Sequence, residues 1–300
     1  MVFPALICSR LFSRPIVLSY HTHLPVYLQS YLPWLPTRWV WKLIRSVHSF
    51  ADLTLVTSPQ LEQEFHSHGI PRVRVWQKGI DTKRFHPFYS CKKMRRRMAG
   101  GKPTDFLIIY VGRLATEKRV QDLEGILEHL PGARLCLVGA GPQEAQSKQM
   151  LPEAVFLGEL QSKELSQAFA SADVFLFPSD SETLGFVVME AMASGLAVVA
   201  ANAGGIPSMI HHRDTGWLVE PGNKAEYIRI LQRLRANSAW RMQLAVRARK
   251  ATEDWTWEAS MANLRNTLYV QAFLNYEDRQ SVRMWHALFN RKNTGMLKTG

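Results

Sequence analysis

Residues 174–190 read VFLFPSDSETLGFVVME, and the fold can be worked out from this stretch. The four apolar residues 174–177 predict a buried strand, so Glu182 lies on the loop that leaves its carboxyl end. Open α/β sheets bind their ligands at this edge. Glu190 falls about two turns into the helix that follows. We therefore expect an α/β protein with a ligand site that contains Glu182 and Glu190.

The chemistry of this loop suits a nucleotide sugar. Carboxylates accept hydrogen bonds from sugar and ribose hydroxyls, while the free N–H groups at a helix start, here around Thr183, Leu184 and Gly185, bind phosphate. For the two glutamates alone a plainer interpretation stays open. Glu182 would then be a first-turn acid that complements the helix dipole, and Glu190 a solvated helix residue.

Short β-branched runs alternate with helical patterns along the chain, which predicts parallel sheets covered by helices. The expected strands lie near residues 15–20, 53–57, 72–76, 106–111, 133–138, 154–157, 173–177, 197–201 and 216–219. The last six strands complete a doubly wound domain over residues 106–254. Only three precede it, so we expect an incomplete N-terminal domain that lacks its first strand and its glycine-rich turn.

The pattern is interrupted at residues 82–105, which contain Pro87, a cluster of basic side chains and a Gly-Gly pair. We expect the partial N-terminal domain to span residues 1–87 and a solvated basic linker to span 88–105. Contact of the basic cluster with a membrane or a partner is the alternative.

A second ligand-facing loop is expected after the first strand of the larger domain. Residues 110–118 read YVGRLATEK, and we expect them to lead into a helix. Arg113 and Lys118 project from the turn after Gly112, where two cations can hold a diphosphate without a metal.

Two more glycine turns follow neighbouring strands. Residues 137–142 read LVGAGP, and Gly139 and Gly141 let the backbone approach a base or ribose; residues 202–207 read NAGGIP. Asp180 and Glu182 have the spacing of a two-carboxylate metal motif, but no further carboxylate cluster accompanies them. We therefore expect no catalytic metal and no cofactor.

Composition narrows the partners. The chain has 300 residues, 46% of them apolar, which is enough for two domains, and its net charge of +12 favours an anionic partner. Zinc-finger spacing, an RNA-recognition signature and a long basic helix are all missing from the sequence, so we expect no nucleic-acid partner. No apolar run reaches the roughly 18 to 20 residues of a membrane-spanning helix.

Together these residues resemble the retaining glycosyltransferases of family 4, over residues 15–275. The matching parts are Gly112-Arg113 with Lys118, Gly139-Ala-Gly-Pro142, Glu182 with Glu190, and Ala203-Gly-Gly-Ile-Pro207. The resemblance implies the GT-B architecture, with two Rossmann-like domains that each contain a parallel sheet. It also implies that a helix over residues 255–276 crosses back to the first domain, which leaves a basic tail at 277–300.

The resemblance also implies roles for individual residues in α-retaining sugar transfer. Glu190 would hold the ribose hydroxyls, Glu182 the donor sugar hydroxyls, and Arg113 and Lys118 the diphosphate. His21 matches the histidine that lines the donor sugar from the N-terminal domain, with a plain surface histidine as the alternative.

Within this family the likeness is greatest to the sulfolipid synthases of plastids and cyanobacteria, which transfer sulfoquinovose from UDP to diacylglycerol. It rests on SYHTHLPVY (19–27), ADLTLV (51–56), WQKGID (76–81), SDSETLG (179–185) and EAMASG (190–195). Many relatives have Asn-Gly before the Asp, whereas this chain has Lys78-Gly79. A cation there can meet the donor's sulfonate, although a plain surface lysine is the alternative. The likeness implies a UDP-sugar donor, a diacylglycerol acceptor and a peripheral location on the plastid envelope or on a cytoplasmic membrane face.

A lipid acceptor requires contact with an anionic membrane surface. Residues 27–50 mix Trp, Leu and basic residues as interfacial helices do, but a domain helix that packs Trp39 and Leu43 into the core is the alternative. Two other functions also stay open. One alternative is another family 4 lipid or sugar transferase that uses UDP-glucose or GDP-mannose, and the other is a noncatalytic nucleotide-binding fragment.

Overall fold

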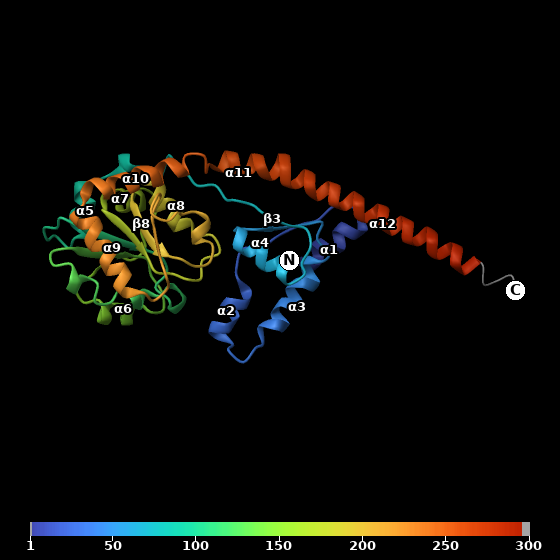
Figure 1. The fold of residues 1–300 in the computed structure, drawn as a ribbon, viewed down its shortest axis with the longest axis horizontal. Helices are drawn as coiled ribbons and strands as arrows, with labels where there is room; N and C mark the ends of the chain where they lie inside the picture. The colour runs from blue at the N-terminus through green and yellow to red at the C-terminus, as the bar shows by residue number, and fades with distance from the viewer. Residues whose placement is uncertain (1, 296–300) are drawn as a thin grey trace. The chain divides into compact units, whose positions relative to one another are not determined.

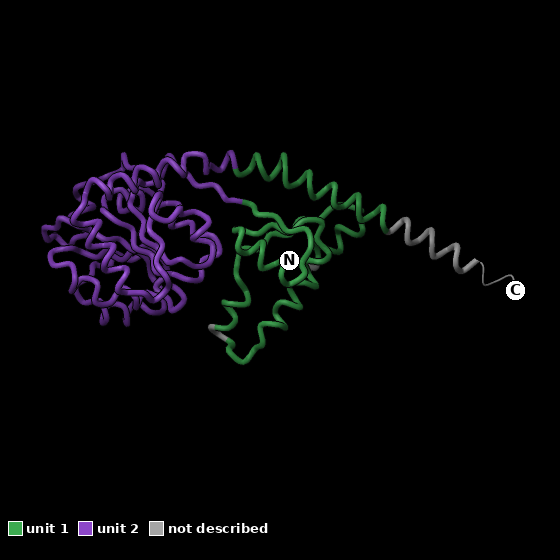
Figure 2. Tube along the Cα trace, viewed as in Figure 1, with its two compact units in different colours: residues 1–76, 260–300 green, residues 77–259 purple. Residues whose placement is uncertain are grey.

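The computed structural model describes residues 2–295. The chain folds into two units, shown in Figure 2. Unit 1 contains residues 1–76 and 260–300, and unit 2 contains residues 77–259. The chain therefore leaves unit 1 once, forms unit 2 and returns to unit 1 at its C-terminal helix.

Unit 2 is built on a six-stranded parallel sheet with the order β6-β5-β4-β7-β8-β9. Its strands are β4 (Leu107–Val111), β5 (Arg134–Val138), β6 (Val155–Phe156), β7 (Val174–Phe177), β8 (Ala197–Ala201) and β9 (Trp217–Val219). Numbered from β4, this is the 3-2-1-4-5-6 order of the Rossmann fold. The strands lie where the sequence predicts them, and the doubly wound domain is confirmed.

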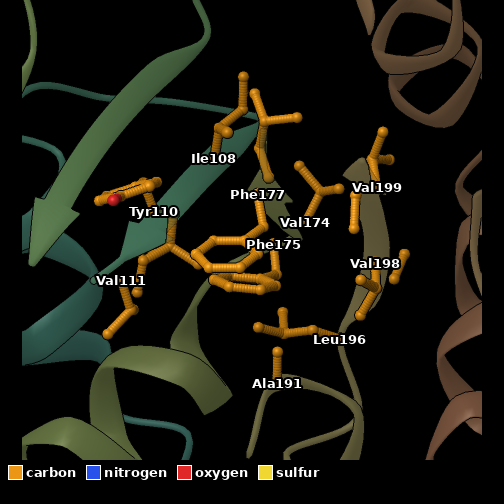
Figure 3. Packing of buried hydrophobic residues seen from close by; sticks show 14 of the residues in the cluster. Ile108, Tyr110, Val111, Val174, Phe175, Phe177, Ala191, Leu196, Val198 and Val199 are labelled. Atoms are coloured by element: carbon orange, nitrogen blue, oxygen red, sulfur yellow. The ribbon is translucent and has the colours of Figure 1, made fainter. Parts of the chain in front are cut away.

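The strands of unit 2 carry apolar side chains on both faces, as buried parallel strands do, and these side chains form its core (Figure 3). Phe175 and Phe177 on β7 stack with ring centroids 5.4 Å apart. Tyr110 of β4 stacks on Phe177 at 5.9 Å. These buried rings hold the carboxyl ends of β4 and β7 in place, and both site loops begin there.

Six α-helices cover this sheet within the described part of the chain. They are α5 (Lys92–Met98), α6 (Glu144–Met150), α7 (Ser162–Ser171), α8 (Phe186–Ala193), α9 (Lys224–Ala236) and α10 (Ser238–Thr252). Asn223 and Asn237 cap α9 and α10 by accepting hydrogen bonds from backbone N–H groups of the first turn. Figure 1 shows α8 and α10 beside β8.

The helix expected after residues 110–118 does not form. Three 3₁₀ turns, Thr116–Lys118, Val120–Leu123 and Leu127–His129, replace it between β4 and β5. Arg119 and Gly125 adopt positive φ angles of 52° and 75°, which a continuous right-handed helix does not allow.

The expected basic linker at 88–105 is wrong. Helix α5 lies inside that range, and its Met94 and Met98 side chains are buried in the core of unit 2. Upstream of it, Ile80 is also buried in this core, and its N–H donates to the carbonyl of Trp255 at 2.7 Å. The boundary therefore falls after Trp76, earlier than the predicted residue 87. The basic side chains of α5 cover its outer face while its methionines anchor it.

Unit 1 contains a three-stranded parallel sheet in the order β1-β2-β3. The strands are β1 (Val17–Ser19), β2 (Leu53–Val56) and β3 (Val73–Val75), and four helices accompany them: α1 (Val2–Leu11), α2 (Leu24–Tyr31), α3 (Thr37–His48) and α4 (Pro59–Ser67). Successive residues of β2 face opposite sides of the sheet. Val56 packs with α3 and α4, while Leu53 and Leu55 pack with the C-terminal helix.

The C-terminal segment is helical from α11 (Trp257–Asn263) through a π-helical segment (Leu264–Leu268) to α12 (Tyr269–Gly295). The expected boundary between a crossover helix and a tail at residue 277 is wrong, because α12 runs through it. Arg279 of α12 donates to the carbonyl oxygen of Phe50 at 3.0 Å, and Asn275 donates to that of Asp52 at 2.8 Å. Residues 296–300 of the expected tail lie outside the described residues. Among residues 2–295, no helix is both long and apolar enough to span a bilayer.

Candidate functional site

The candidate site lies at the switch point of the unit 2 sheet. Strand β4 has β5 on one side and β7 on the other. Successive strands are therefore added in one direction from β4 to β6 and in the opposite direction from β7 to β9. Loops that leave neighbouring strands at such a point diverge and leave a crevice for a ligand. Arg113 and Lys118 follow β4, and Glu182 follows β7.

Lys118 and Glu182 meet across this switch point. The Lys118 ammonium forms an ion pair with Glu182 Oε1, and both side chains are largely buried. The Ser179 hydroxyl donates to the same carboxylate oxygen at 3.1 Å. The structure thus brings together two predicted site residues that lie far apart in the sequence, and leaves the second oxygen of Glu182 outside these two contacts.

Arg113 occupies the same loop as Lys118 but a different environment. Its side chain is 53% exposed, and its guanidinium lies 4.0 Å from the Glu117 carboxylate. The Tyr110 hydroxyl donates to the Arg113 carbonyl at 3.0 Å. This hydrogen bond holds the backbone of Arg113, while its side chain lies in solvent. The loop therefore presents one buried cation and one exposed cation at the same edge of the sheet.

The backbone of Glu182 is held by the glycine pair of residues 202–207. The Gly205 N–H donates to the Glu182 carbonyl at 2.7 Å. A Cβ on Gly204 would overlap that same carbonyl, and a Cβ on Gly205 would overlap the carbonyl of Thr183. These glycines allow the β8 turn to close on the Glu182 loop, so their contacts are internal to the protein.

Helix α8 begins after Gly185, which has a φ of 84° at the N-cap position. Glu182 therefore precedes the helix, and the interpretation of Glu182 as a first-turn acid is wrong. Leu184 is buried, and Gly185 supplies the left-handed conformation that turns the chain into the helix. The N–H groups at a helix start can bind an anion, but in α8 the Val188 N–H already donates to the Gly185 carbonyl at 2.9 Å, so the first two residues of the helix would have to provide the donors.

Glu190 lies in the second turn of α8 in a partly enclosed position. Burial raises its pKa from an ordinary 4.5 to about 7, and the charge of Arg84 opposes that rise. Within residues 2–295, no side chain forms a hydrogen bond or an ion pair with its carboxylate. Because the Glu190 side chain is partly buried, its interpretation as a fully solvated helix residue is wrong.

The glycines of the β4 and β5 turns pack against each other. The Gly112 N–H donates to the Val138 carbonyl at 3.0 Å, and the Leu114 N–H donates to the Ala140 carbonyl at 3.0 Å. A Cβ on Gly139 would overlap the Gly112 carbonyl, and one on Gly141 would overlap the Leu114 carbonyl. These glycines are required by the contact between the two turns, whether or not a ligand also approaches them.

The two histidines after β1 have different surroundings. His21 is exposed, and its Nε2 lies 2.8 Å from the Ser19 hydroxyl. His23 instead caps α2, where its Nδ1 accepts from the Val26 N–H and its Nε2 lies 2.7 Å from the Glu64 carboxylate. His23 therefore has a structural role within unit 1, while His21 keeps its imidazole at the surface of the loop.

Lys78 belongs to unit 2 and is 7% exposed, so its interpretation as a plain surface lysine is wrong. Burial lowers the pKa of its ammonium from 10.5 to about 8. The next residue, Gly79, lies against the backbone of Trp257, which a Cβ would overlap. The Trp257 ring stacks on Phe186, the first residue of α8, with centroids 6.3 Å apart. This chain of contacts ties the Lys78 segment to the start of α8.

Sequence reasoning missed Arg119, the residue after Lys118. Its guanidinium contacts Asp122 at 2.8 Å and Asp180 at 3.2 Å. Asp180 is thus held by an arginine and Glu182 by a lysine, so the two acids of the apparent metal motif serve two separate ion pairs. The two consecutive cations in the sequence were a signal, but their different partners, Glu182 for Lys118 and Asp122 with Asp180 for Arg119, appear only in the structure.

Comparison with known proteins gives a consistent assignment. The chain matches the model of glycosyltransferase family 4 over residues 1–84 and that of glycosyl transferases group 1 over residues 93–252. The sulfoquinovosyl transferase of Arabidopsis thaliana is 42% identical over 281 residues, which are 91% of this chain and 55% of that protein. A GDP-mannose-dependent alpha-mannosyltransferase of Mycobacterium tuberculosis is 39% identical over 71% of this chain and 56% of that protein. The chain spans about half the length of these curated relatives.

Solved structures share the fold. HepE of Anabaena, in complex with UDP and glucose, has a TM-score of 0.74 and 21% identity over 89% of this chain and 75% of that one. Sucrose-phosphate synthase of Thermosynechococcus elongatus has a TM-score of 0.77 and 25% identity over 91% of this chain and 71% of that one. These likenesses confirm the predicted GT-B type with Rossmann-like units. Because the group 1 match alone covers more than half of the residues, the chain belongs to the group 1 glycosyl transferases.

Proposed function

We propose that this protein transfers sulfoquinovose from UDP-sulfoquinovose to diacylglycerol, with retention of the α configuration. The observation that carries a nucleotide-sugar site is the Lys118–Glu182 pair at the switch point, with the start of α8 beside it. The relative named a sulfoquinovosyl transferase, 42% identical over 91% of this chain, supports the choice of sugar.

The proposed reaction exchanges one bond at the anomeric carbon. The bond from C1 to the diphosphate oxygen breaks, and the acceptor hydroxyl oxygen bonds to C1 on the same face. The acceptor proton passes to the departing diphosphate, so UDP leaves with it. Lys118 and Arg113 would stabilise the negative charge that develops on the diphosphate, and the first-turn N–H groups of α8 would add to this. The proposal assigns no step to a metal or cofactor.

The carboxylates would orient the donor. Glu190, with its open acceptor sites, would take both ribose hydroxyls, and Glu182 would take hydroxyls of the sugar with the oxygen that Ser179 and Lys118 leave open. In this arrangement Lys118 would have two roles. It would neutralise charge on the diphosphate, and its ion pair would fix the position of the Glu182 carboxylate that binds the sugar.

Lys78 would read the sulfonate. A sulfonate is fully ionised at any pH of interest, and a buried ammonium discriminates an anion from a neutral hydroxymethyl group more strongly than an exposed one does. UDP-glucose, which has that neutral group, is the matched ligand. Lys78→Met keeps the apolar stem and removes the charge, so it should lower affinity for UDP-sulfoquinovose and leave that for UDP-glucose unchanged. Lys102→Met, at an exposed lysine, is the control.

A GDP-mannose donor is the second candidate, since a mannosyltransferase relative is 39% identical. Calorimetric titration of the full chain with UDP-sulfoquinovose, UDP-glucose and GDP-mannose separates the candidates. The proposal predicts the tightest binding for UDP-sulfoquinovose and a loss of that preference in Lys78→Met. Preferred binding of GDP-mannose would overturn the choice of donor, and binding of nucleotide sugar without any turnover would favour a noncatalytic fragment.

A further inference from the structure

Helix α3 of unit 1 has two apolar faces, and only one of them is covered. Val40, Trp41 and Ile44 are buried in the core between the sheet and α4. On the opposite side of the helix, Trp39 is 56% exposed and Leu43 is 63% exposed. The expectation that Trp39 and Leu43 pack into the core is therefore wrong, because Trp41 and its neighbours fill that space.

The uncovered face continues into the connection between α2 and α3, which form a hairpin in Figure 1. Trp34 in this connection is 74% exposed, and Leu32 is also exposed. Large apolar side chains are thus concentrated on one helix face and its adjoining loop. We call Trp34, Trp39 and Leu43, together with Leu32, the α2–α3 surface.

Cations flank this surface. Arg38, Lys42 and Arg45 on α3 are all exposed. The Lys42 ammonium lies over the Trp39 ring, 4.9 Å from its centroid. Residues 24–50 contain no Asp or Glu, so nothing in this part of the sequence offsets the positive charge. Tryptophan beside lysine or arginine, with no acid, is the composition of a helix that lies in a lipid interface.

We propose that the α2–α3 surface docks the protein on an anionic lipid bilayer. Trp34, Trp39 and Leu43 would enter the boundary between headgroups and acyl chains, where tryptophan is favoured. Arg38 and Lys42 would meet anionic headgroups. The charge pattern favours a bilayer over a protein partner, because the cores of protein interfaces are depleted of charged residues and of lysine in particular. The inference rests on side chains of unit 1 alone, so it stands apart from the choice of donor in unit 2.

Flotation of the full chain with phosphatidylcholine vesicles, with and without phosphatidylglycerol, tests the proposal. Wild-type protein should bind only when phosphatidylglycerol is present. Trp39→Ala should weaken binding about tenfold, from the apolar area withdrawn. Arg38→Ala with Lys42→Ala should weaken it about fivefold per cation and remove most of its salt dependence. Phe88→Ala and Lys92→Ala with Lys93→Ala remove exposed apolar and basic groups from unit 2 and are the matched controls, which should bind as wild type does.

UDP-sugar affinity and thermal unfolding are measured on the same variants. Both should be unchanged, since the altered side chains face solvent. Two results would overturn the proposal. In the first, the control variants weaken vesicle binding as much as the α2–α3 variants do. In the second, the α2–α3 variants change the oligomeric state and leave vesicle binding intact. The second result would assign the surface to a second copy of the chain. UDP-sugar binding is measured separately from vesicle binding. A protein that binds vesicles but no UDP-sugar would contradict the proposed function and would not affect this inference.

Discussion

Lys118 and Glu182 form an ion pair between the loops that follow β4 and β7, across the switch point of the unit 2 sheet. The pair is largely enclosed, and Ser179 adds a hydrogen bond to Glu182. Each partner would also contact the donor in the proposed reaction. The pair therefore links diphosphate binding to the position of the carboxylate that orients the sugar.

Removal of the Lys118 charge should reduce turnover strongly. Lys118→Met should lower kcat by about a hundredfold or more, the usual loss when one stabilising group is removed from a developing negative charge. Because the variant leaves Glu182 without its ion-pair partner, it should also destabilise the fold. Adding Glu182→Gln should restore part of that stability, with a coupling of about 1 kcal/mol. Urea unfolding of the two single variants and the double variant measures this, and strictly additive losses would show that the pair is not coupled.

Arg113 should matter for turnover and very little for stability. Its side chain is half exposed, and its guanidinium lies 4.0 Å from the Glu117 carboxylate, so Arg113→Ala should change the free energy of unfolding by less than about 0.5 kcal/mol. Turnover should fall far more than donor affinity, because the charge it would stabilise develops in the transition state. Steady-state kinetics with calorimetric donor titration checks this. Equal losses of kcat and donor affinity would count against the role.

Glu190 should make stability depend on pH between about 4.5 and 7. Its folded pKa is raised to about 7, so folding favours the protonated form. The favourable contribution is full below pH 4.5 and is lost as pH rises through 7. Glu190→Gln removes this dependence, and at pH 8 it should be more stable than wild type by on the order of 2 kcal/mol. Chemical unfolding of both proteins at pH 4.5 and pH 8 gives the difference, and parallel curves would refute the raised pKa.

Gly139→Ala should be severely destabilising for a reason that is internal to the fold. The position has a φ of 132°, and a Cβ there would overlap the carbonyl oxygen of Gly112. The loss should exceed about 3 kcal/mol, because strain and backbone displacement add. Gly101→Ala is the control, since Gly101 also has a positive φ, 75°, but nothing lies within 4 Å of the added Cβ. A similar, small loss in both variants would mean that the two glycine turns can separate at little cost.

The strands were predictable because each is a short apolar run with a clear local signature. All nine lie within the expected ranges, from β1 to β9. That the loops of the candidate site lie together was predictable for the same reason, since loops after parallel strands share one edge of the sheet. That Lys118 pairs with Glu182 was not predictable, because the 3₁₀ turns after β4 decide where Lys118 points and the sequence favoured a helix there.

The domain boundary and the faces of α3 were harder to predict because both depend on contacts between distant parts of the chain. Ile80 joins unit 2 through a hydrogen bond to Trp255, which no local pattern around residue 80 reveals. Trp39 and Trp41 are both plausible core residues by composition. Only the packing of Trp41 against Phe65 and His68, with ring centroids 5.5 Å and 3.9 Å away, shows which one is enclosed.

The most direct test of the central claim is product formation. The full chain is incubated with UDP-sulfoquinovose and vesicles that contain diacylglycerol and phosphatidylglycerol, and the lipid fraction is analysed by mass spectrometry, with UDP-glucose and GDP-mannose in parallel. Wild type should form sulfoquinovosyl diacylglycerol, and Lys118→Met should form almost none. A glucosyl or mannosyl lipid as the main product, or equal product from wild type and Lys118→Met, would contradict it.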